Sequence, residues 1–257
     1  MKLSTLGRSV FIGLTFSFLY LPIFILIIFS FNSRSFPSSW DNFTLIWYKL
    51  LFTNTEIWVS FFNSLIIAIC STTICISLTI FMIYFLYKGG KIGKFITIFY
   101  GNLIIPETVL AVGLISYFTT MKIPLGMITI IIAHSVIGLG FSIPLLYIRY
   151  KDLDKNIFEA SLNLGASHLQ TFIKIALPLI RPTLLTSGLI IFIISFDDFI
   201  LAYFCSGNSI QTLPLFLISS IRYGISPIIN ALASILLVMT TIIVVVFFYL
   251  KKVTKIL

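Results

Sequence analysis

Charged residues are what this sequence has least of. Only 10% of its 257 residues are charged, 59% are hydrophobic, and the mean hydropathy is +1.12. A water-soluble domain of this length needs far more charge to cover its surface, so the composition excludes a soluble globular protein and favours an integral membrane protein. Basic residues outnumber acidic ones, 17 against 8. They are dispersed and form no basic helix or aromatic–basic patch, so nucleic-acid binding is not expected.

The residues that build metal, disulfide and phosphate sites are equally scarce. Cys70, Cys75 and Cys205 lie in or beside apolar runs without metal-ligand spacing, and an odd number makes no disulfide framework. His134 and His168 are isolated, so we expect a helix-packing hydrogen-bonding residue and a solvated loop residue rather than metal ligands. No P-loop motif occurs. We therefore expect no ATP-binding site, no cofactor and no metal in this chain.

Long apolar runs are abundant instead. The hydrocarbon core of a bilayer is about 30 Å thick and needs about 20 apolar residues in a helix. Because backbone groups cannot stay unpaired in lipid, these runs predict an all-α integral membrane protein with six transmembrane helices in one domain, residues 1–257. The first run is too long for a signal-peptide core and precedes no small-x-small cleavage site, so we interpret it as a retained helix. The predicted spans cover about 10–31, 61–86, 95–118, 123–148, 184–204 and 228–250.

The distribution of positive charge predicts the orientation. With the N-terminus inside, only Arg34, Lys49, Lys122 and Arg222 face outward, which leaves 13 of the 17 basic residues on the cytoplasmic side. Cytoplasmic loops carry the excess of lysine and arginine in membrane proteins. Both termini are therefore predicted to be cytoplasmic.

A polar segment, residues 149–182, separates the fourth and fifth predicted spans, and we call it the coupling segment. Asp152 or Asp154 can cap a first short helix, which Gly165 would end in a left-handed conformation. Ser167 and Gln170 have the spacing of a capping box, so a second helix is expected to start there and run toward the fifth span.

The coupling segment has two interpretations on residue chemistry alone. It can dock on a partner, or it can lie on lipid headgroups as an amphipathic helix pair. The small residues that would allow close approach are Ala160 and Ser161, and those that would offer apolar contact are Ile157, Phe158, Leu162 and Leu164.

A longer motif in this segment favours docking. Glu159-Ala160-Ser161 is followed after three residues by Gly165, and after nine more by Ile175-Ala176-Leu177-Pro178. This pattern resembles the EAA loop of bacterial ABC importer permeases, with Ser161 in place of the second alanine as the only departure. The resemblance implies a type I permease fold whose cytoplasmic coupling helices, here with Glu159, Ala160, Ser161, Gly165, Ile175 and Pro178, bind an ATPase subunit. It also implies two ATPase copies, a second permease subunit of similar fold and an external substrate-binding protein.

Three acidic residues, Glu107, Asp197 and Asp198, fall within the predicted spans. A carboxylate at a helix centre costs about 2.5–3.5 kcal/mol on insertion scales, so we expect these residues to be functional. On one helix Asp197 and Asp198 would diverge by about 100° and could not face one point. No span contains lysine or arginine, so the acids predict a path for a cationic substrate. The alternative is structural pairing with a base on a neighbouring subunit.

A second resemblance indicates the chemical class of this cationic substrate. SFDDFILAYFCSGNSIQTLPLF (195–216), IIPETVLAVGL (104–114) and TLIWYKLL (44–51) resemble the permeases of spermidine/putrescine importers of the PotC type. The resemblance implies polyamine transport across a bacterial inner membrane, and polyamine ammonium groups suit carboxylates and aromatic faces. Trp47 can supply such a face in the first outer loop, or it can be an interfacial anchor.

Other functions remain as alternatives. An ABC permease for another small cation fits the same residues, and a proton-coupled secondary transporter could use the acids as relays. An intramembrane aspartic protease is excluded, because it needs one acid on each of two facing helices and Asp197 and Asp198 are adjacent in sequence. No other catalytic constellation occurs, so an enzyme is not expected.

Overall fold

The computed structural model describes residues 5–34, 39–222 and 227–254. Their secondary structure is helical apart from loops and one isolated bridge between Asn32 and Phe43, which confirms the all-α prediction. The chain falls into two compact units, a first unit of Met1–Ile57 with Leu217–Leu257 and a second unit of Trp58–Phe216. The extreme ends of the chain, residues 1–4 and 255–257, carry part of the orientation prediction and lie outside the described residues.

The first unit contains three helices, α1 (Thr5–Phe29), α2 (Ile46–Thr53) and α12 (Pro227–Thr254). Helix α12 packs against both α1 and α2. The described side chains of α1 are largely exposed apolar groups, as expected for a helix surrounded by lipid. The loop after α1 is held by the buried Asn32, whose Oδ1 accepts a hydrogen bond from the Asp41 backbone N–H at 2.9 Å.

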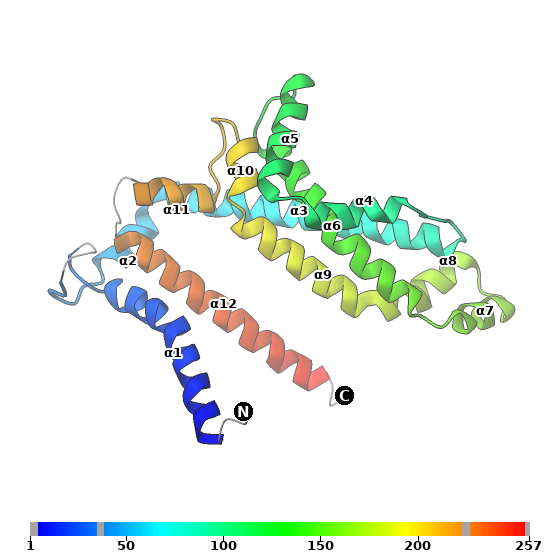
Figure 1. Cartoon of the computed structure of the whole chain (residues 1–257), viewed down its shortest axis with the longest axis horizontal. Helices are drawn as coiled ribbons and strands as arrows, with labels where there is room; N and C mark the ends of the chain where they lie inside the picture. The colour runs from blue at the N-terminus through cyan, green and yellow to red at the C-terminus, as the bar shows by residue number, and fades with distance from the viewer. Residues whose placement is uncertain (1–4, 35–38, 223–226, 255–257) are drawn as a thin grey trace. The chain divides into compact units, whose positions relative to one another are not determined.

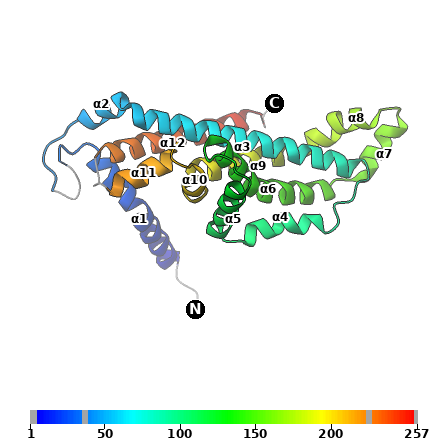
Figure 2. The ribbon, with the colours of Figure 1, turned by 90° about the horizontal axis from the view of Figure 1, so that it is seen from above.

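The second unit is built around α6. Figures 1 and 2 show α3, α6 and α9 running alongside one another, with α5 and α10 at one end of α6 and α7 and α8 at its other end. Helix α4 also packs against α6. Helix α11 (Leu213–Arg222) begins in this unit and ends in the first. The remaining bounds are α3 Thr55–Tyr87, α4 Phe95–Ile104, α5 Glu107–Thr120, α6 Met127–Lys151, α7 Lys155–Asn163, α8 His168–Thr171, the π-helical turn Phe172–Ala176, α9 Leu177–Asp197 and α10 Ile200–Cys205.

Small residues allow α6 to occupy the centre. A Cβ atom on Gly138 would lie 2.6 Å from Cys75 Sγ and 2.9 Å from Ile191 Cγ2, so only glycine permits this approach of α3 and α9. The buried Thr79 hydroxyl donates to Ser142 Oγ across α3 and α6 at 2.8 Å. Small residues and interhelical hydrogen bonds of this kind are the usual basis of helix association in lipid.

The expected spans correspond to the observed helices, and two of them are interrupted. Among the described residues, four helices are long and apolar enough to cross a membrane, or five when a bent pair counts as one span. The sixth expected span corresponds to α12, which has 28 residues. The third span, expected at 95–118 with Pro106 breaking its local hydrogen bonding, is divided into α4 and α5 at that proline. The fifth span, expected at 184–204, is interrupted as well, after Asp197.

Proline explains the break in the third span. Helices α4 and α5 meet at a bend of 115°, and Ile105 and Pro106 between them are extended, with ψ of 129° and 134°. Proline lacks the N–H that a helix needs, and it disfavours helical geometry in the preceding residue. The break makes Glu107 the first residue of α5, where a carboxylate interacts favourably with the helix dipole.

Candidate functional site

The coupling segment forms the predicted helix–turn–helix. The Asn156 backbone N–H donates to Asp154 Oδ1 at 2.9 Å, which identifies Asp154 as the cap of α7. Gly165 has φ of +87°, in the left-handed region that glycine adopts without strain. The Ser167 N–H donates to Gln170 Oε1 at 2.9 Å and the Gln170 N–H donates to Ser167 Oγ at 3.3 Å, which confirms the capping box.

The second helix extends beyond the coupling segment. It was expected to run toward Pro178, just before the fifth span, and α8, the π-helical turn and α9 form one continuous helix from His168 to Asp197. The π-helical turn at Phe172–Ala176 directly precedes α9, whose second residue is Pro178. Inside a continuous helix a proline removes one i→i−4 hydrogen bond, and the π-helical turn marks the place where the regular α-helical ladder is interrupted before it. The second coupling helix is therefore continuous with the fifth span.

Aromatic side chains attach the coupling segment to the end of α3. The Tyr87 ring lies 5.6 Å from Phe158 on α7 and 5.8 Å from Phe172 on the π-helical turn, and Tyr84 lies 4.9 Å from Phe172. Phe158 was expected to offer contact to a partner, and this is wrong because it is buried against Tyr87. The outward surface is formed instead by Glu159, Ala160 and Leu164, the last with 89% of its side chain exposed.

The second site is assembled around Asp198, which is buried at the break between α9 and α10. Its backbone is extended, with ψ of 126°, and its side chain is buried whereas that of its neighbour Asp197 is exposed. The carboxylate accepts hydrogen bonds from the backbone N–H groups of Ala202 at 2.9 Å and Leu201 at 3.4 Å. It therefore stabilises the exposed first turn of α10.

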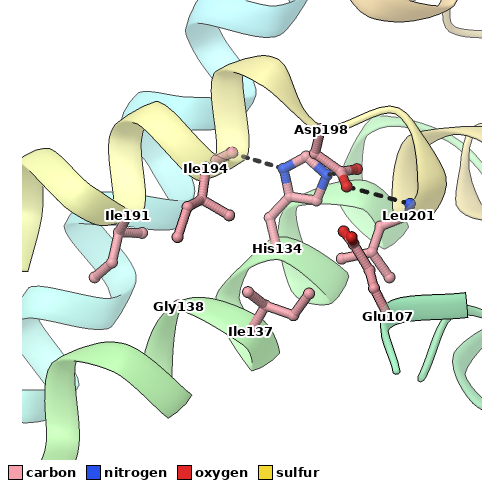
Figure 3. Close-up of a pocket in the computed structure, with 9 residues that line it drawn as sticks. Glu107, His134, Ile137, Gly138, Ile191, Ile194, Asp198 and Leu201 are labelled. Atoms are coloured by element: carbon pink, nitrogen blue, oxygen red, sulfur yellow. Dashed lines mark hydrogen bonds and ion pairs between the residues drawn. The ribbon is translucent and has the colours of Figure 1, made fainter. Parts of the chain in front are cut away.

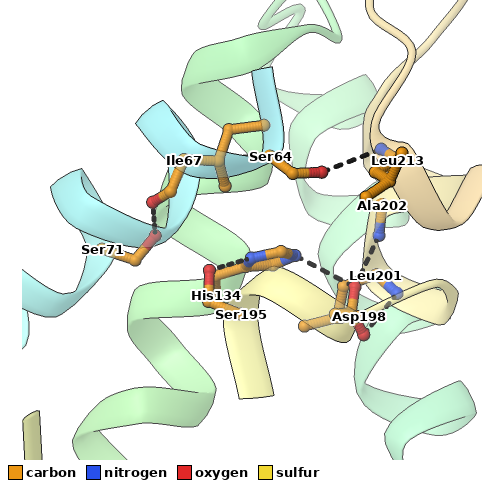
Figure 4. Close-up of polar contacts among 9 residues, drawn as sticks. All are labelled: Ser64, Ile67, Ser71, His134, Ser195, Asp198, Leu201, Ala202 and Leu213. Atoms are coloured by element: carbon orange, nitrogen blue, oxygen red, sulfur yellow. Dashed lines mark hydrogen bonds and ion pairs between the residues drawn. The ribbon is translucent and has the colours of Figure 1, made fainter. Parts of the chain in front are cut away.

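His134 of α6 is a further hydrogen-bonding partner of the Asp198 carboxylate. Its Nε2 lies 3.0 Å from Asp198 Oδ2, and its Nδ1 lies 2.7 Å from the hydroxyl of Ser195 on α9. All three side chains are buried, and they form one hydrogen-bonded row (Figures 3 and 4). The expectation that His134 is a helix-packing hydrogen-bonding residue is confirmed. The predicted spans contain no lysine or arginine, and within this chain the side-chain partner of Asp198 is a histidine.

Glu107 approaches the same place from α5. It lines a small pocket of about 10 Å³, room for about one water molecule, together with His134, Ser195 and Asp198, and its carboxyl group points into that pocket (Figure 3). Glu107 also lines a wider neighbouring cavity of about 190 Å³, which Asn102 and Phe141 border. The half-buried carboxylate thus lies between the wider cavity and the buried carboxylate. We call Glu107, His134, Ser195 and Asp198 the buried polar cluster.

The other two predicted substrate-path residues lie elsewhere. Asp197 is exposed, at the last position of α9. Trp47 is half-buried in the first unit, and its indole N–H donates to the Asn32 carbonyl at 2.7 Å. Its hydrogen-bonding edge is therefore occupied, and only the face of the ring is available to a cation.

The chemistry available to the buried polar cluster is charge recognition and proton exchange. Two carboxyl groups on separate helices share one pocket, with an imidazole that can carry or release a proton. Among the described residues, no group of three or more histidine, cysteine, aspartate or glutamate side chains could hold a metal ion. Sequence reasoning did not assign His134 to this site. The signal it left unused was the position of a polar residue in the middle of an apolar run.

Known proteins resemble this chain over most of its length. Residues 56–254 match the family described as "Binding-protein-dependent transport system inner membrane component". The "Spermidine/putrescine transport system permease protein PotC" of Escherichia coli (strain K12) is 35% identical over 90% of this chain and 89% of that protein. The "Putrescine transport system permease protein PotI" of the same strain is 32% identical over 90% and 85%.

A solved structure matches at the level of the fold. One chain of a bacterial ABC transporter involved in the import of the acidic polysaccharide alginate superposes with a TM-score of 0.73. The match covers 98% of this chain and 99% of that chain at 16% sequence identity, so it supports the arrangement of helices and says nothing of cargo.

Proposed function

Because the chain belongs to the family of inner membrane components of binding-protein-dependent transport systems, we propose that it is the permease subunit of an importer whose cargo is a polyamine. Membership makes it a multi-pass membrane component of a transport system. The observation that carries the polyamine proposal is the convergence of Glu107 and Asp198, from separate helices, on one pocket. Two carboxylates at one place attract a ligand with several ammonium groups.

In this proposal the cation moves past acidic residues at the end of α6 where α5 and α10 lie. Glu107 receives an ammonium group in the wider cavity, and Asp198, held by His134, provides the next negative charge. Asp197, which is exposed, would face a second permease subunit of similar fold. Trp47 would offer its ring face to the cation before it enters the spans.

The energy comes from outside the chain, since the sequence has no P-loop. Two copies of an ATPase subunit would bind the exposed surface of the coupling segment, with contacts from Glu159, Ala160, Ser161 and Gly165. Movement of that surface would reach the fifth span through the continuous helix that contains Ile175 and Pro178, and would reach α3 through Phe158 and Phe172. An external polyamine-binding protein would deliver the cargo.

The same proposal includes the location of the protein and its orientation in the membrane. The chain would form a single permease domain, residues 1–257, in a bacterial inner membrane with both termini in the cytoplasm. The charge distribution between loops supports this orientation. Fusing a reporter that is active only outside the cell to either terminus tests it, and an active reporter would overturn it.

The decisive experiment is uptake of labelled spermidine by cells that lack their own importer and express this chain with its partner subunits. Uptake that stops when the partner ATPase is disabled, and that unlabelled putrescine competes away, is the expected result. Uptake that a protonophore abolishes while ATP is maintained would instead indicate a proton-coupled transporter. No spermidine uptake by a correctly assembled complex would overturn the polyamine proposal and leave the family membership intact.

A further inference from the structure

A separate cavity lies at the end of α6 where the coupling segment begins. The loop after α3, the last turns of α6 and the start of α7 line a partly open cavity of about 650 Å³. Three lysines from two distant stretches of the chain line it, together with two tyrosines. These residues are Lys91, Lys151, Lys155, Tyr147 and Tyr150.

The charge of this cavity is uncompensated. Among the residues that the structure describes, no aspartate or glutamate lines it. In the described part of the chain, the ion pairs within 4.0 Å are Arg34–Asp41 and His134–Asp198, so none of the three lysines is paired with a carboxylate. Lys151 lies 4.6 Å from the centroid of the Tyr147 ring, which orients its ammonium group without neutralising it. An acid-free cavity with three ammonium groups is complementary to an anion.

The rest of the lining indicates what kind of anion fits. Leu86, Ile92 and Phe158 give the cavity apolar walls beside its lysines. The loop 88–94 directly follows the long apolar helix α3, and Lys151 ends the apolar helix α6. Both stretches therefore lie where a membrane span meets water. Basic pockets between spans at this level suit lipid phosphates, whose acyl chains lie against the neighbouring apolar surface.

We propose that this cavity binds the phosphate headgroup of an anionic phospholipid, with Lys91, Lys151 and Lys155 around the phosphate. The proposal depends on the membrane placement of the chain and not on its cargo. Its consequence for transport follows from Phe158, which lines the cavity and also packs against Tyr87 beneath the coupling segment. A bound headgroup would therefore support α7 in the position from which it meets the ATPase.

The test uses the complete importer, purified and placed in phosphatidylcholine nanodiscs with and without phosphatidylglycerol. The number of phosphatidylglycerol molecules retained by the complex is counted by native mass spectrometry, without cargo. Replacing Lys91, Lys151 and Lys155 together by glutamine should weaken retention at least about tenfold, since each lysine near an anionic membrane surface contributes on the order of 1 kcal/mol. Replacing the same three by arginine should restore retention, because the charge is kept.

A matched control separates the cavity from general surface charge. Lys88, Lys94 and Lys174 are exposed, are predicted to be cytoplasmic and do not line the cavity. Their joint replacement by glutamine removes the same charge, so it measures the loss due to surface attraction alone, and the cavity variant should lose at least about tenfold more retention than this control. Equal losses in the two triple variants would overturn the proposal, because they would indicate charge attraction without a site.

Two other occupants have distinct outcomes. If glycerol phosphate added to phosphatidylcholine nanodiscs binds the three lysines and phosphatidylglycerol is not preferred, the anion is a soluble phosphate and the lipid proposal is wrong. If the glutamine variant loses its ATPase subunit while its lipid retention is unchanged, the lysines dock a protein and the proposal is also wrong. Failure of spermidine uptake does not bear on either result, because the readout contains no polyamine.

Discussion

The coupling segment and the buried polar cluster differ in how their contacts are made. In the coupling segment the defining hydrogen bonds join residues two or three positions apart, and Glu159, Ala160 and Gly165 are exposed. In the buried polar cluster, His134 bonds to residues 61 and 64 positions away, and every bonded side chain is buried. One site is shaped by local backbone chemistry and the other by the packing of helices.

This difference determines what a substitution should cost. When a buried, hydrogen-bonded charge is removed, its former partners stay buried and cannot bond to water instead. The free energy of unfolding therefore falls steeply. A substitution in an exposed turn costs only the strain of an unfavourable backbone conformation, because water can hydrogen-bond to the polar groups that remain. The predictions below run from the largest expected change in the free energy of unfolding to the smallest.

The largest effect is expected from Asp198→Ala. It leaves buried His134 and the N–H groups of Leu201 and Ala202 without their acceptor, so the free energy of unfolding should fall by about 3–5 kcal/mol. Thermal unfolding of the purified complex measures this fall. The double variant with His134→Ala should lose less than the sum of the two single variants, because the two residues share one interaction. Strict additivity would contradict the pairing.

A smaller loss is expected from Ser195→Ala, which removes the hydroxyl that bonds to His134 Nδ1. A buried polar group left without a partner costs about 1–3 kcal/mol. The control lies on the same helix. Ser187 is equally buried, and its hydroxyl has no hydrogen-bond partner within the described chain, so Ser187→Ala should cost nothing measurable. Equal melting temperatures for the two serine variants would remove Ser195 from the buried polar cluster.

The next smaller loss in the free energy of unfolding is expected in the exposed turn at Gly165. Gly165→Val forces a β-branched residue to φ of +87°, at a cost of about 1–2 kcal/mol. A Cβ atom there meets nothing within 4 Å, so the cost is backbone strain and not a clash. The strain should tilt the coupling helices, and both uptake and recovery of the ATPase in a pull-down should fall.

Gly165→Asn is the matched control, because asparagine tolerates the left-handed conformation and should keep most of the uptake. Equal loss in both variants would show that the site needs the absence of a side chain, which would implicate a surface pressed directly on the glycine. Normal ATPase recovery with valine would show that the turn is not needed for docking.

The same difference explains how much the sequence alone could predict. Asp154, Gly165, Ser167 and Gln170 act on groups within a few residues, so their spacing was enough to predict both short helices and the turn. The apolar runs predicted the spans for a similar reason, since each helix satisfies its own backbone.

The buried polar cluster could not be predicted in this way. The contact between His134 and Asp198 depends on how α6 packs against α9, and Gly138 makes that packing close in a manner that hydropathy does not record. The bend after Ile104 was predicted only as a local loss of helix hydrogen bonding, and the break after Asp197 was missed, because each lies inside an apolar run of the length expected for one span. Pro106 was visible in the first break, but the extended backbone at Asp198 had no such marker.

The smallest effect on stability is expected from Asp197→Asn, and it tests the comparison most sharply. Asp197 is adjacent to Asp198 but exposed, and no partner of its carboxylate is seen within the described chain, so the free energy of unfolding should change by less than about 0.5 kcal/mol. If Asp197 faces the cation at the boundary with a second permease subunit, spermidine uptake should nevertheless fall, with assembly and melting temperature unchanged. Asp198→Asn should lower both uptake and melting temperature, because it removes the charge from a buried, paired position. Uptake that is unchanged in both single variants and in the double variant would reject the cation path altogether, whereas loss of melting temperature in Asp197→Asn would mean that its carboxylate is a structural group like its neighbour's.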